Sequence, residues 1–114
     1  MLNLTPHAIG VVDGVDGLTV HTIPASGQVA RVVTALRTLG TLGLPGGVVV
    51  PVTSTINVVT GIPAPGGEKF IVSSLVLDRL GQEYRGQAFA PDTGPTAVRK
   101  DDGQVIAVRQ FRTV

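Results

Sequence analysis

The chain has 114 residues and a formal net charge of only +1, which indicates a single domain and argues against binding of duplex DNA through a strongly basic face. Cysteine is absent, and this excludes disulfides and thiolate metal sites. Because 43% of the residues are hydrophobic but only 4% are aromatic, the core must consist mainly of valine, leucine, isoleucine and alanine, and we expect so small a protein to gain stability from oligomerisation.

Short valine-rich segments with period-two alternation recur along the chain, separated by glycine, proline and aspartate. This pattern predicts a mainly β fold, a single compact antiparallel β domain over residues 1–114 that resembles a sandwich or barrel and carries one short helix. The predicted strands are Leu2–Leu4, Ile9–Val12, Leu18–Ile23, Val29–Leu39, Val48–Thr53, Ile56–Thr60, Phe70–Val72, Ala88–Ala90, Ala97–Arg99 and Val105–Arg112.

Aspartate and glycine mark the predicted tight turns, because both tolerate the backbone angles that hairpins need. Asp13–Gly17 predicts one hairpin and Asp101–Gly103 a second. The alternation after the first turn places His21 toward solvent or a partner. Gly40–Gly47 and Gly61–Gly67 are expected to be flexible loops.

The one predicted helix follows a buried strand and covers Ser73–Gly81, with a serine at its start and a glycine at its end. Ser73 and Ser74 would place hydroxyls beside the unpaired N–H groups of the first turn, where an anion such as phosphate is favoured. Ordinary N-capping by serine explains the same pattern and is the simpler interpretation of this signal alone.

A stiff polar arch is predicted between Pro91 and Pro95, because each proline fixes its own φ and restricts the residue before it. The arch would present Asp92 and Thr93, and Arg99 follows shortly after. A carboxylate, a hydroxyl and free backbone N–H groups held at low entropic cost suggest a binding element.

Two further groups of polar residues are candidates. Ser26 and Arg31 flank a turn at which a hydroxyl, backbone N–H groups and a guanidinium could meet an anion, although an arginine that reaches solvent is the simpler explanation. Asn3, Thr5 and His7 alternate, so their side chains would share one side of the N-terminal strand. Buried polar groups there would need partners, and the Asp92 arch is the candidate; a solvated edge strand is the alternative.

Arginine makes up seven of the nine basic residues, and most arginines lie in the C-terminal half, where Tyr84, Phe89 and Phe111 are the nearby aromatic residues. Arginine for phosphate and an aromatic ring for a base are the minimum of a nucleotide site. A charged edge strand that resists aggregation explains the same residues.

Catalysis has little support in the sequence. The two histidines are too few and too far apart to suggest a metal site, and neither lies beside a recognisable nucleophile motif. We therefore expect a protein that is not an enzyme and that uses neither a metal nor a cofactor.

No apolar run approaches the roughly 18 residues that span a bilayer, and the start lacks the features of a secretory signal, so we expect a cytoplasmic protein with no membrane partner.

Four strings carry a resemblance to a known family: Leu-Asn-Leu-Thr-Pro-His at residues 2–7, Ser-Gly-Gln-Val-Ala-Arg-Val at 26–32, Ile-Val-Ser-Ser-Leu-Val at 71–76, and Ala-Pro-Asp-Thr-Gly-Pro at 90–95 with Val-Arg at 98–99. Across most of its length the chain resembles a family of small, largely uncharacterised proteins of phages, prophages and actinobacteria. This resemblance implies a phage context and a location in the host bacterial cell.

In size and in its arginine and serine turns the chain is also similar to phage sponge proteins, which oligomerise and sequester nucleotide immune signals. The similarity implies an anti-defence function in which a cyclic oligonucleotide or an ADP-ribose-type nucleotide is bound at a protomer interface without cleavage. The expected ligand-binding residues are Thr5, His7, Ser26, Arg31, Ser73, Ser74, Phe89, Asp92, Thr93 and Arg99. The alternatives are a virion or assembly protein and a small phosphoesterase.

Overall fold

The computed structural model describes all residues from 1 to 114 and contains ten strands, one α-helix and one 3-10 helix. In chain order these elements are β1 (Leu2–Asn3), β2 (Ile9–Val12), β3 (Val20–Ile23), β4 (Arg31–Leu44), β5 (Val48–Thr60), β6 (Phe70–Ile71), α1 (Ser74–Leu77), η1 (Gln82–Tyr84), β7 (Ala88–Pro91), β8 (Val98–Arg99), β9 (Val105–Ala107) and β10 (Phe111–Thr113). None of the helices has the length and apolar composition that crossing a membrane requires.

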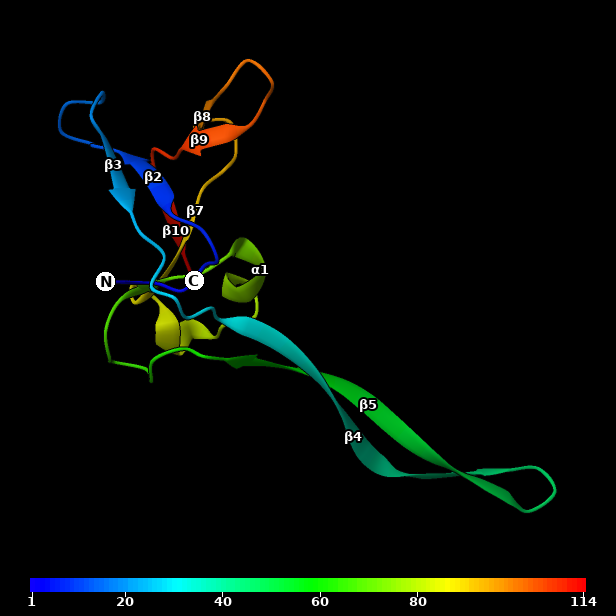
Figure 1. The fold of residues 1–114 in the computed structure, drawn as a ribbon. Helices are drawn as coiled ribbons and strands as arrows, with labels where there is room; N and C mark the ends of the chain where they lie inside the picture. The colour runs from blue at the N-terminus through cyan, green and yellow to red at the C-terminus, as the bar shows by residue number, and fades with distance from the viewer.

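The predicted mainly β fold with one short α-helix is confirmed. The strands form one four-stranded sheet in the order β1-β6-β7-β10 and three two-stranded antiparallel ribbons, β2–β3, β4–β5 and β8–β9. Within the four-stranded sheet, β1, β6 and β7 run parallel and β10 joins β7 in the antiparallel direction. The strands do not close into the predicted sandwich or barrel. The two longest strands, β4 and β5, pair with each other and extend away from the body of the protein as one ribbon (Figure 1).

The core lies where the four-stranded sheet meets α1 and η1. Phe70, Val72 and Ala90 are completely buried, and Val76 of α1 packs against the same cluster. The rings of Phe70 and Tyr84 meet edge to face with their centroids 5.8 Å apart. The Tyr84 hydroxyl donates a hydrogen bond to the carbonyl of Pro63, so the one polar atom of this aromatic pair has a partner.

Asn3 is a polar residue at the centre of the fold, with only 1% of its surface exposed. Its Nδ2 donates to the carbonyls of His7, at 2.9 Å, and Ile23, at 3.2 Å. Its Oδ1 accepts from the backbone N–H and the hydroxyl of Thr5, at 3.1 and 2.6 Å. The prediction that Asp92 would satisfy this polar group is therefore wrong: residues of the adjacent turn and the end of β3 do so.

The two predicted hairpins are confirmed. Asp13–Gly17 lies in the turn between β2 and β3, and Asp101–Gly103 in the turn between β8 and β9. His21 points outward as expected, with 60% of its side chain exposed, and its Nε2 lies 3.1 Å from Oδ2 of Asp13.

The β4–β5 ribbon, called the arm below, differs from its prediction. Gly40–Leu44 belongs to β4 instead of a flexible loop, and no break interrupts β5 between Thr53 and Ile56. The turn is reduced to residues 45–47, where Gly46 and Gly47 have φ angles of 84° and 78°. The register shifts once, between Thr38 and Gly40. Paired glycines with positive φ allow this tight turn, and the apolar alternation then continues on both sides of it.

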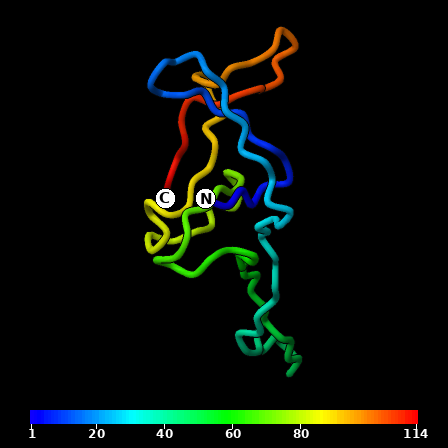
Figure 2. The backbone as a smooth tube through the Cα atoms, turned by 60° about the vertical axis from the view of Figure 1, so that its left-hand side comes forward, coloured from blue at the N-terminus to red at the C-terminus, as the bar shows by residue number.

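The arm gives the molecule its shape. The protein measures 71 × 36 × 24 Å and its radius of gyration is 19.7 Å, whereas a globular chain of this length has a radius of gyration of about 13 Å. Figure 2 shows the same arm from another side, separate from the rest of the chain along most of its length. Most of its residues are exposed.

The helix is shorter than predicted. Ser73 is the N-cap, and its hydroxyl accepts a hydrogen bond from the N–H of Val76 at 3.3 Å. The helix ends at Leu77 with Asp78 as its C-cap, before the predicted terminal Gly81. The predicted last strand, Val105–Arg112, is also divided into two, because the N–H of Val108 turns to the carbonyl of Gly10 in β2.

We predict that Asn3→Ala lowers the free energy of unfolding by about 2–3 kcal/mol, because several buried backbone groups lose their partner. Urea unfolding at a fixed protein concentration measures this. The matched control is Asn57→Ala on the exposed arm, which should change stability by less than about 0.5 kcal/mol. Equal losses for both variants would contradict the central position given to Asn3.

Candidate functional site

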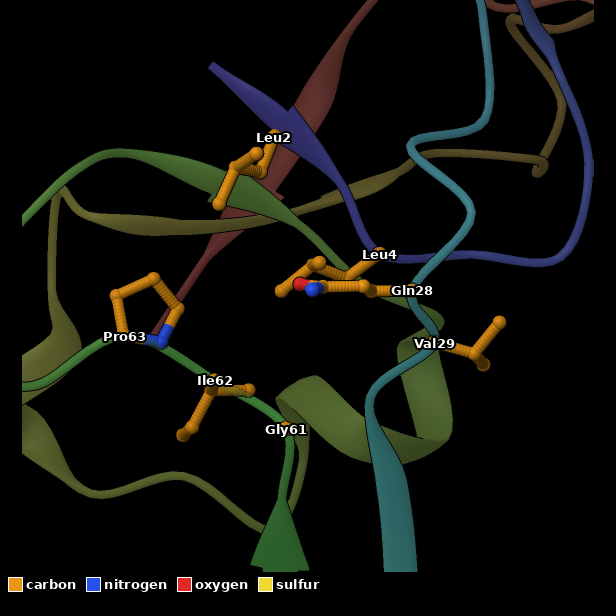
Figure 3. A pocket seen from close by; sticks show the side chains of 7 residues that line it. All are labelled: Leu2, Leu4, Gln28, Val29, Gly61, Ile62 and Pro63. Carbon is orange, nitrogen blue, oxygen red and sulfur yellow. The ribbon is translucent and has the colours of Figure 1, made fainter.

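The largest hollow of the protein lies at the root of the arm and has a volume of about 580 Å³ (Figure 3). It is bordered by the N-terminal strand and by the two segments that enter and leave the arm. Gly61, directly after β5, has a φ of 80°, and a Cβ there would lie 3.1 Å from the carbonyl oxygen of Val29. This glycine therefore lets the two ends of the arm approach closely. The lining residues are Leu2, Leu4, Gln28, Val29, Gly61, Ile62 and Pro63.

The chemistry of this hollow is mainly apolar. Gln28 supplies the polar side chain of the lining, and no lining residue is charged. Such a surface fits an apolar group better than a phosphate. None of the ten predicted ligand-binding residues lines it.

A smaller hollow of about 240 Å³ lies between β2, the end of β7 and β9. Thr93 is the predicted site residue that borders it. Gly10 of β2 borders this hollow. A Cβ at this position would lie 2.5 Å from the carbonyl oxygen of Ile106, so the close contact between β2 and β9 requires glycine. The lining residues are Ala8, Ile9, Gly10, Pro91, Thr93, Val105, Ile106, Ala107 and Val108.

The predicted arch after Pro91 is held mainly by its own contacts. The Oδ1 of Asp92 accepts from the N–H of Gly94 at 2.9 Å, and its Oδ2 accepts from Nε2 of Gln110 at 2.6 Å. The hydrogen bond from Gln110, followed by that from Gly94, lowers the pKa of Asp92 below its ordinary value of 3.8. The carboxylate thus connects the arch to the segment before β10.

Arg99 also binds within the protein. Its guanidinium donates to the carbonyl of Thr93 at 2.6 Å and to the carbonyl of Gly103 at 2.8 Å. The structure therefore brings Thr93 and Arg99 together as predicted, but in a contact that ties the arch to the β8–β9 hairpin.

Several predicted hydroxyls stabilise local turns. The Ser26 hydroxyl lies 3.2 Å from both the N–H and the carbonyl oxygen of Gln28. Thr5 binds Asn3, and its hydroxyl also lies 3.0 Å from the carbonyl oxygen of His7. Ser73 caps α1, which agrees with the simpler of the two interpretations of that position.

The remaining predicted residues lie on separate elements. Arg31 is exposed at the first residue of β4, and Ser74 is exposed at the start of α1. Phe89 is half-buried in β7, and His7 is exposed between β1 and β2. In this protomer the ten residues thus form local groups instead of one pocket.

Sequence reasoning missed two residues that organise these regions. Gln110 holds the Asp92 carboxylate, and Gln28 borders the root of the arm. A glutamine has no periodicity or spacing signal of its own, so only the pairing of distant segments reveals its role. The burial of Asn3 was also hidden, because the alternation of polar residues suggested a shared face but not its environment.

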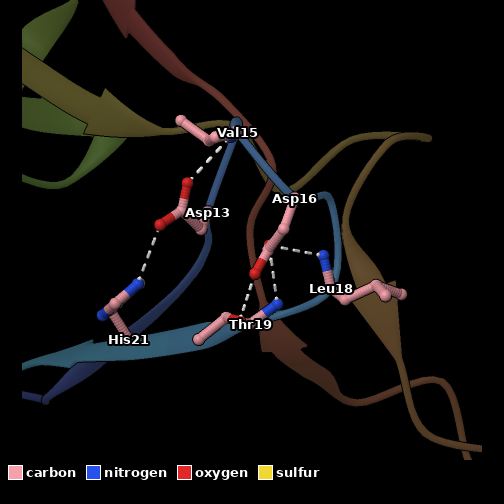
Figure 4. Close-up of polar contacts among 6 residues, drawn as sticks. All are labelled: Asp13, Val15, Asp16, Leu18, Thr19 and His21. Atoms are coloured by element: carbon pink, nitrogen blue, oxygen red, sulfur yellow. Dashed lines mark hydrogen bonds and ion pairs between the residues drawn. The ribbon is translucent and has the colours of Figure 1, made fainter.

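A further group of polar contacts lies in the β2–β3 hairpin (Figure 4). Asp16 accepts hydrogen bonds from the hydroxyl of Thr19 and from the N–H groups of Leu18 and Thr19, both at 2.9 Å. These bonds, with the hydroxyl first, lower the pKa of Asp16 from 3.8 to about 2. The pKa of Asp13 is lowered by the N–H of Val15 and then by His21. Each carboxylate thus closes its own turn.

No group of three or more histidine, aspartate or glutamate side chains is arranged to hold a metal ion.

We predict that Thr19→Val raises the pKa of Asp16 from about 2 toward 3.8, because the hydroxyl donor is lost while the two N–H donors remain. Folding lowers this pKa, so ionised Asp16 stabilises the fold above about pH 4, and the contribution disappears as the pH falls toward 2. NMR titration of the Asp16 carboxyl carbon measures the change. The carboxyl of Asp92 is the internal control and should titrate as in the parent protein.

Comparison with known proteins adds one partial match. No protein-family model matches the chain, and no solved structure matches it. A segment of 94 residues, 82% of the chain, is 35% identical to tRNA(Ile)-lysidine synthase of Thermobifida fusca. The chain spans only 28% of that protein's length, so the match is a similarity to part of a larger enzyme.

Proposed function

We propose that this protein is a homo-oligomeric assembly component whose copies join through the arm. The observation that carries the proposal is the two-faced character of the β4–β5 ribbon.

Side chains of a ribbon alternate between its two faces, and paired residues share a face. Starting from the pair Arg31 and Thr60, every second pair belongs to the same face. Apart from Arg31 with Thr60 and Arg37 with Ser54, that face is apolar, and we call it the apolar face. Its apolar residues are Val33, Ala35, Leu42, Leu44, Val48, Val50, Val52, Ile56 and Val58.

The other face is richer in polar residues. It carries Thr34 opposite Asn57, whose side chains lie within hydrogen-bond distance at 3.2 Å, and Thr38 opposite Thr53. Leu36 and Val49 are its exposed apolar exceptions. The contrast between the two faces is typical of a sheet that has water on one side and a protein surface on the other.

The core does not cover the apolar face: the arm residues that pack against it, Val32 and Val59, lie on the other face at the root. Val33 and Leu42 are 47% and 51% exposed, in the two halves of the arm. An isolated two-stranded ribbon is at best marginally stable in water, whereas packing of a hydrophobic face stabilises it. Burial of these side chains against another apolar surface would therefore stabilise the ribbon.

A second copy of the chain is the partner that fits. The polar pair Arg37 and Ser54 lies at the middle of the apolar face, with apolar pairs on both sides. Because this pattern is symmetric about its middle, two copies can bring their apolar residues together about a twofold axis. The arm also carries two arginines and no carboxylate, so its recognition rests on apolar contact.

The area of the arm fits an interface that includes its root. Thirteen residues of strand cover roughly 43 Å by 10 Å, or about 400 Å², which is half of the roughly 800 Å² per partner in a standard interface. The apolar hollow beside Val29 and Ile62 adjoins the root and supplies further surface of the same character.

An assembly role also agrees with the phage context that the sequence resemblance suggests. The partial match to the lysidine synthase covers too little of that enzyme to support a synthase activity. We accordingly propose a role in assembly without turnover of a substrate.

We predict that Ile56→Asp, which places a charge on the apolar face, weakens self-association on the order of a hundredfold or more. Sedimentation equilibrium measures the association constant. The matched control is Thr53→Asp, a charge on the opposite face of the same strand, which should leave association within about threefold of the parent. A parent protein that stays monomeric, or equal weakening by both variants, would refute the proposal.

Nucleotide sequestration is a second candidate, favoured by the position of Arg31 on the apolar face at the root of the arm. An interface between arms would include this exposed guanidinium, and a ligand at the interface would draw residues from two copies. We place it second because Asp92, Arg99 and Ser73 are engaged within the protomer.

For the second candidate we predict that one nucleotide raises the melting temperature by several degrees in a screen of cyclic dinucleotides, cyclic trinucleotides and ADP-ribose variants. Arg31→Ala should abolish the shift, whereas Lys69→Ala, an exposed cation outside the arm, should retain it. Mass spectrometry should recover the nucleotide intact. Time-dependent product formation would instead indicate a phosphoesterase, and no shift with any ligand would exclude sequestration of these classes.

A further inference from the structure

Arg37 occupies an unusual position on the arm. It is the seventh of the fourteen residues of β4, and its partner Ser54 is the seventh of the thirteen residues of β5. The pair therefore marks the middle of the arm and lies on the otherwise apolar face. Apolar pairs flank it toward the root, at Ala35 with Ile56, and toward the tip, at Gly40 with Val52.

Because Arg37 and Ser54 lie at the middle of the arm, they would face their counterparts in a second copy whether the two arms run parallel or antiparallel. When two arms overlap fully and run parallel, residues at equal heights face each other. When they overlap fully and run antiparallel about a twofold axis, the axis passes through the middle. Both arrangements place Arg37 and Ser54 of one copy opposite Arg37 and Ser54 of its partner.

Two guanidinium groups in an apolar interface need a counter-charge, because the burial of unpaired like charges is costly. The arm cannot supply it, since no aspartate or glutamate occurs between Arg31 and Thr60. Arginine binds oxyanions such as phosphate through two parallel N–H donors, and a serine hydroxyl can add another donor.

We propose that the interface between two arms holds a phosphate-type oxyanion, free or as part of a nucleotide, bound by Arg37 and Ser54 of both copies. This inference rests on the proposed assembly through the arm. The site is absent from a single protomer and forms only when two copies meet, so anion binding and self-association stabilise each other.

The test compares association of the parent protein in inorganic phosphate and in chloride at matched ionic strength, by sedimentation equilibrium. We expect phosphate at ten times its dissociation constant to strengthen dimerisation about tenfold. Arg37→Gln should abolish this dependence and associate at least as tightly in chloride as the parent does. Lys100→Gln, which removes one exposed positive charge from the β8–β9 turn, should keep the dependence.

Each outcome has a distinct meaning. A parent protein that is monomeric under both conditions overturns the assembly and the anion site together. A parent protein that associates equally in phosphate and chloride overturns the anion site alone and indicates that Arg37 extends past the ribbon edge to water. Repetition with 5′-AMP separates the two sources of phosphate, because a stronger effect than that of inorganic phosphate favours a nucleotide and an equal effect favours the free anion.

Discussion

The rest of the fold depends on the hydrogen bonds of the buried Asn3 side-chain amide. Its hydrogen bonds join β1 to the turn that ends at His7 and to the end of β3 at Ile23. The backbone continues this role, since the carbonyls of Asn3 and Leu4 accept from the N–H groups of Ser26 and Ala30. The N-terminal strand thereby fixes where the chain leaves the body to begin the arm.

The sequence predicted local structure well and long-range relations poorly. Alternation and Asp-Gly turns located β2 with its exact bounds and both short hairpins, and the serine cap of α1 was also recognised. Glycines are misleading in the arm, because Gly40 and Gly43 predict a loop although they continue β4. Which distant strands pair, as β1 does with β6, depends on packing that periodicity does not encode.

The candidate site shows the same limit. Residue types correctly marked the arch around Asp92 as an ordered polar element, but they could not distinguish a group that awaits a ligand from one that already has partners. Gln110 and Thr93 occupy the hydrogen-bonding groups of Asp92 and Arg99, respectively. The amphipathic arm, in contrast, becomes visible only when the register pairs β4 with β5, because the shift between Thr38 and Gly40 interrupts the alternation along β4.

The separation in sequence between β1 and β6 also bears on how the chain folds during its synthesis. Strand β1 cannot pair until Phe70 has left the ribosome, whereas the arm is a local hairpin complete by Thr60. Local contacts form faster than distant ones. We therefore expect the apolar ribbon to form before the core that carries it, so that its apolar face is exposed to aggregation while the rest of the chain is still being made.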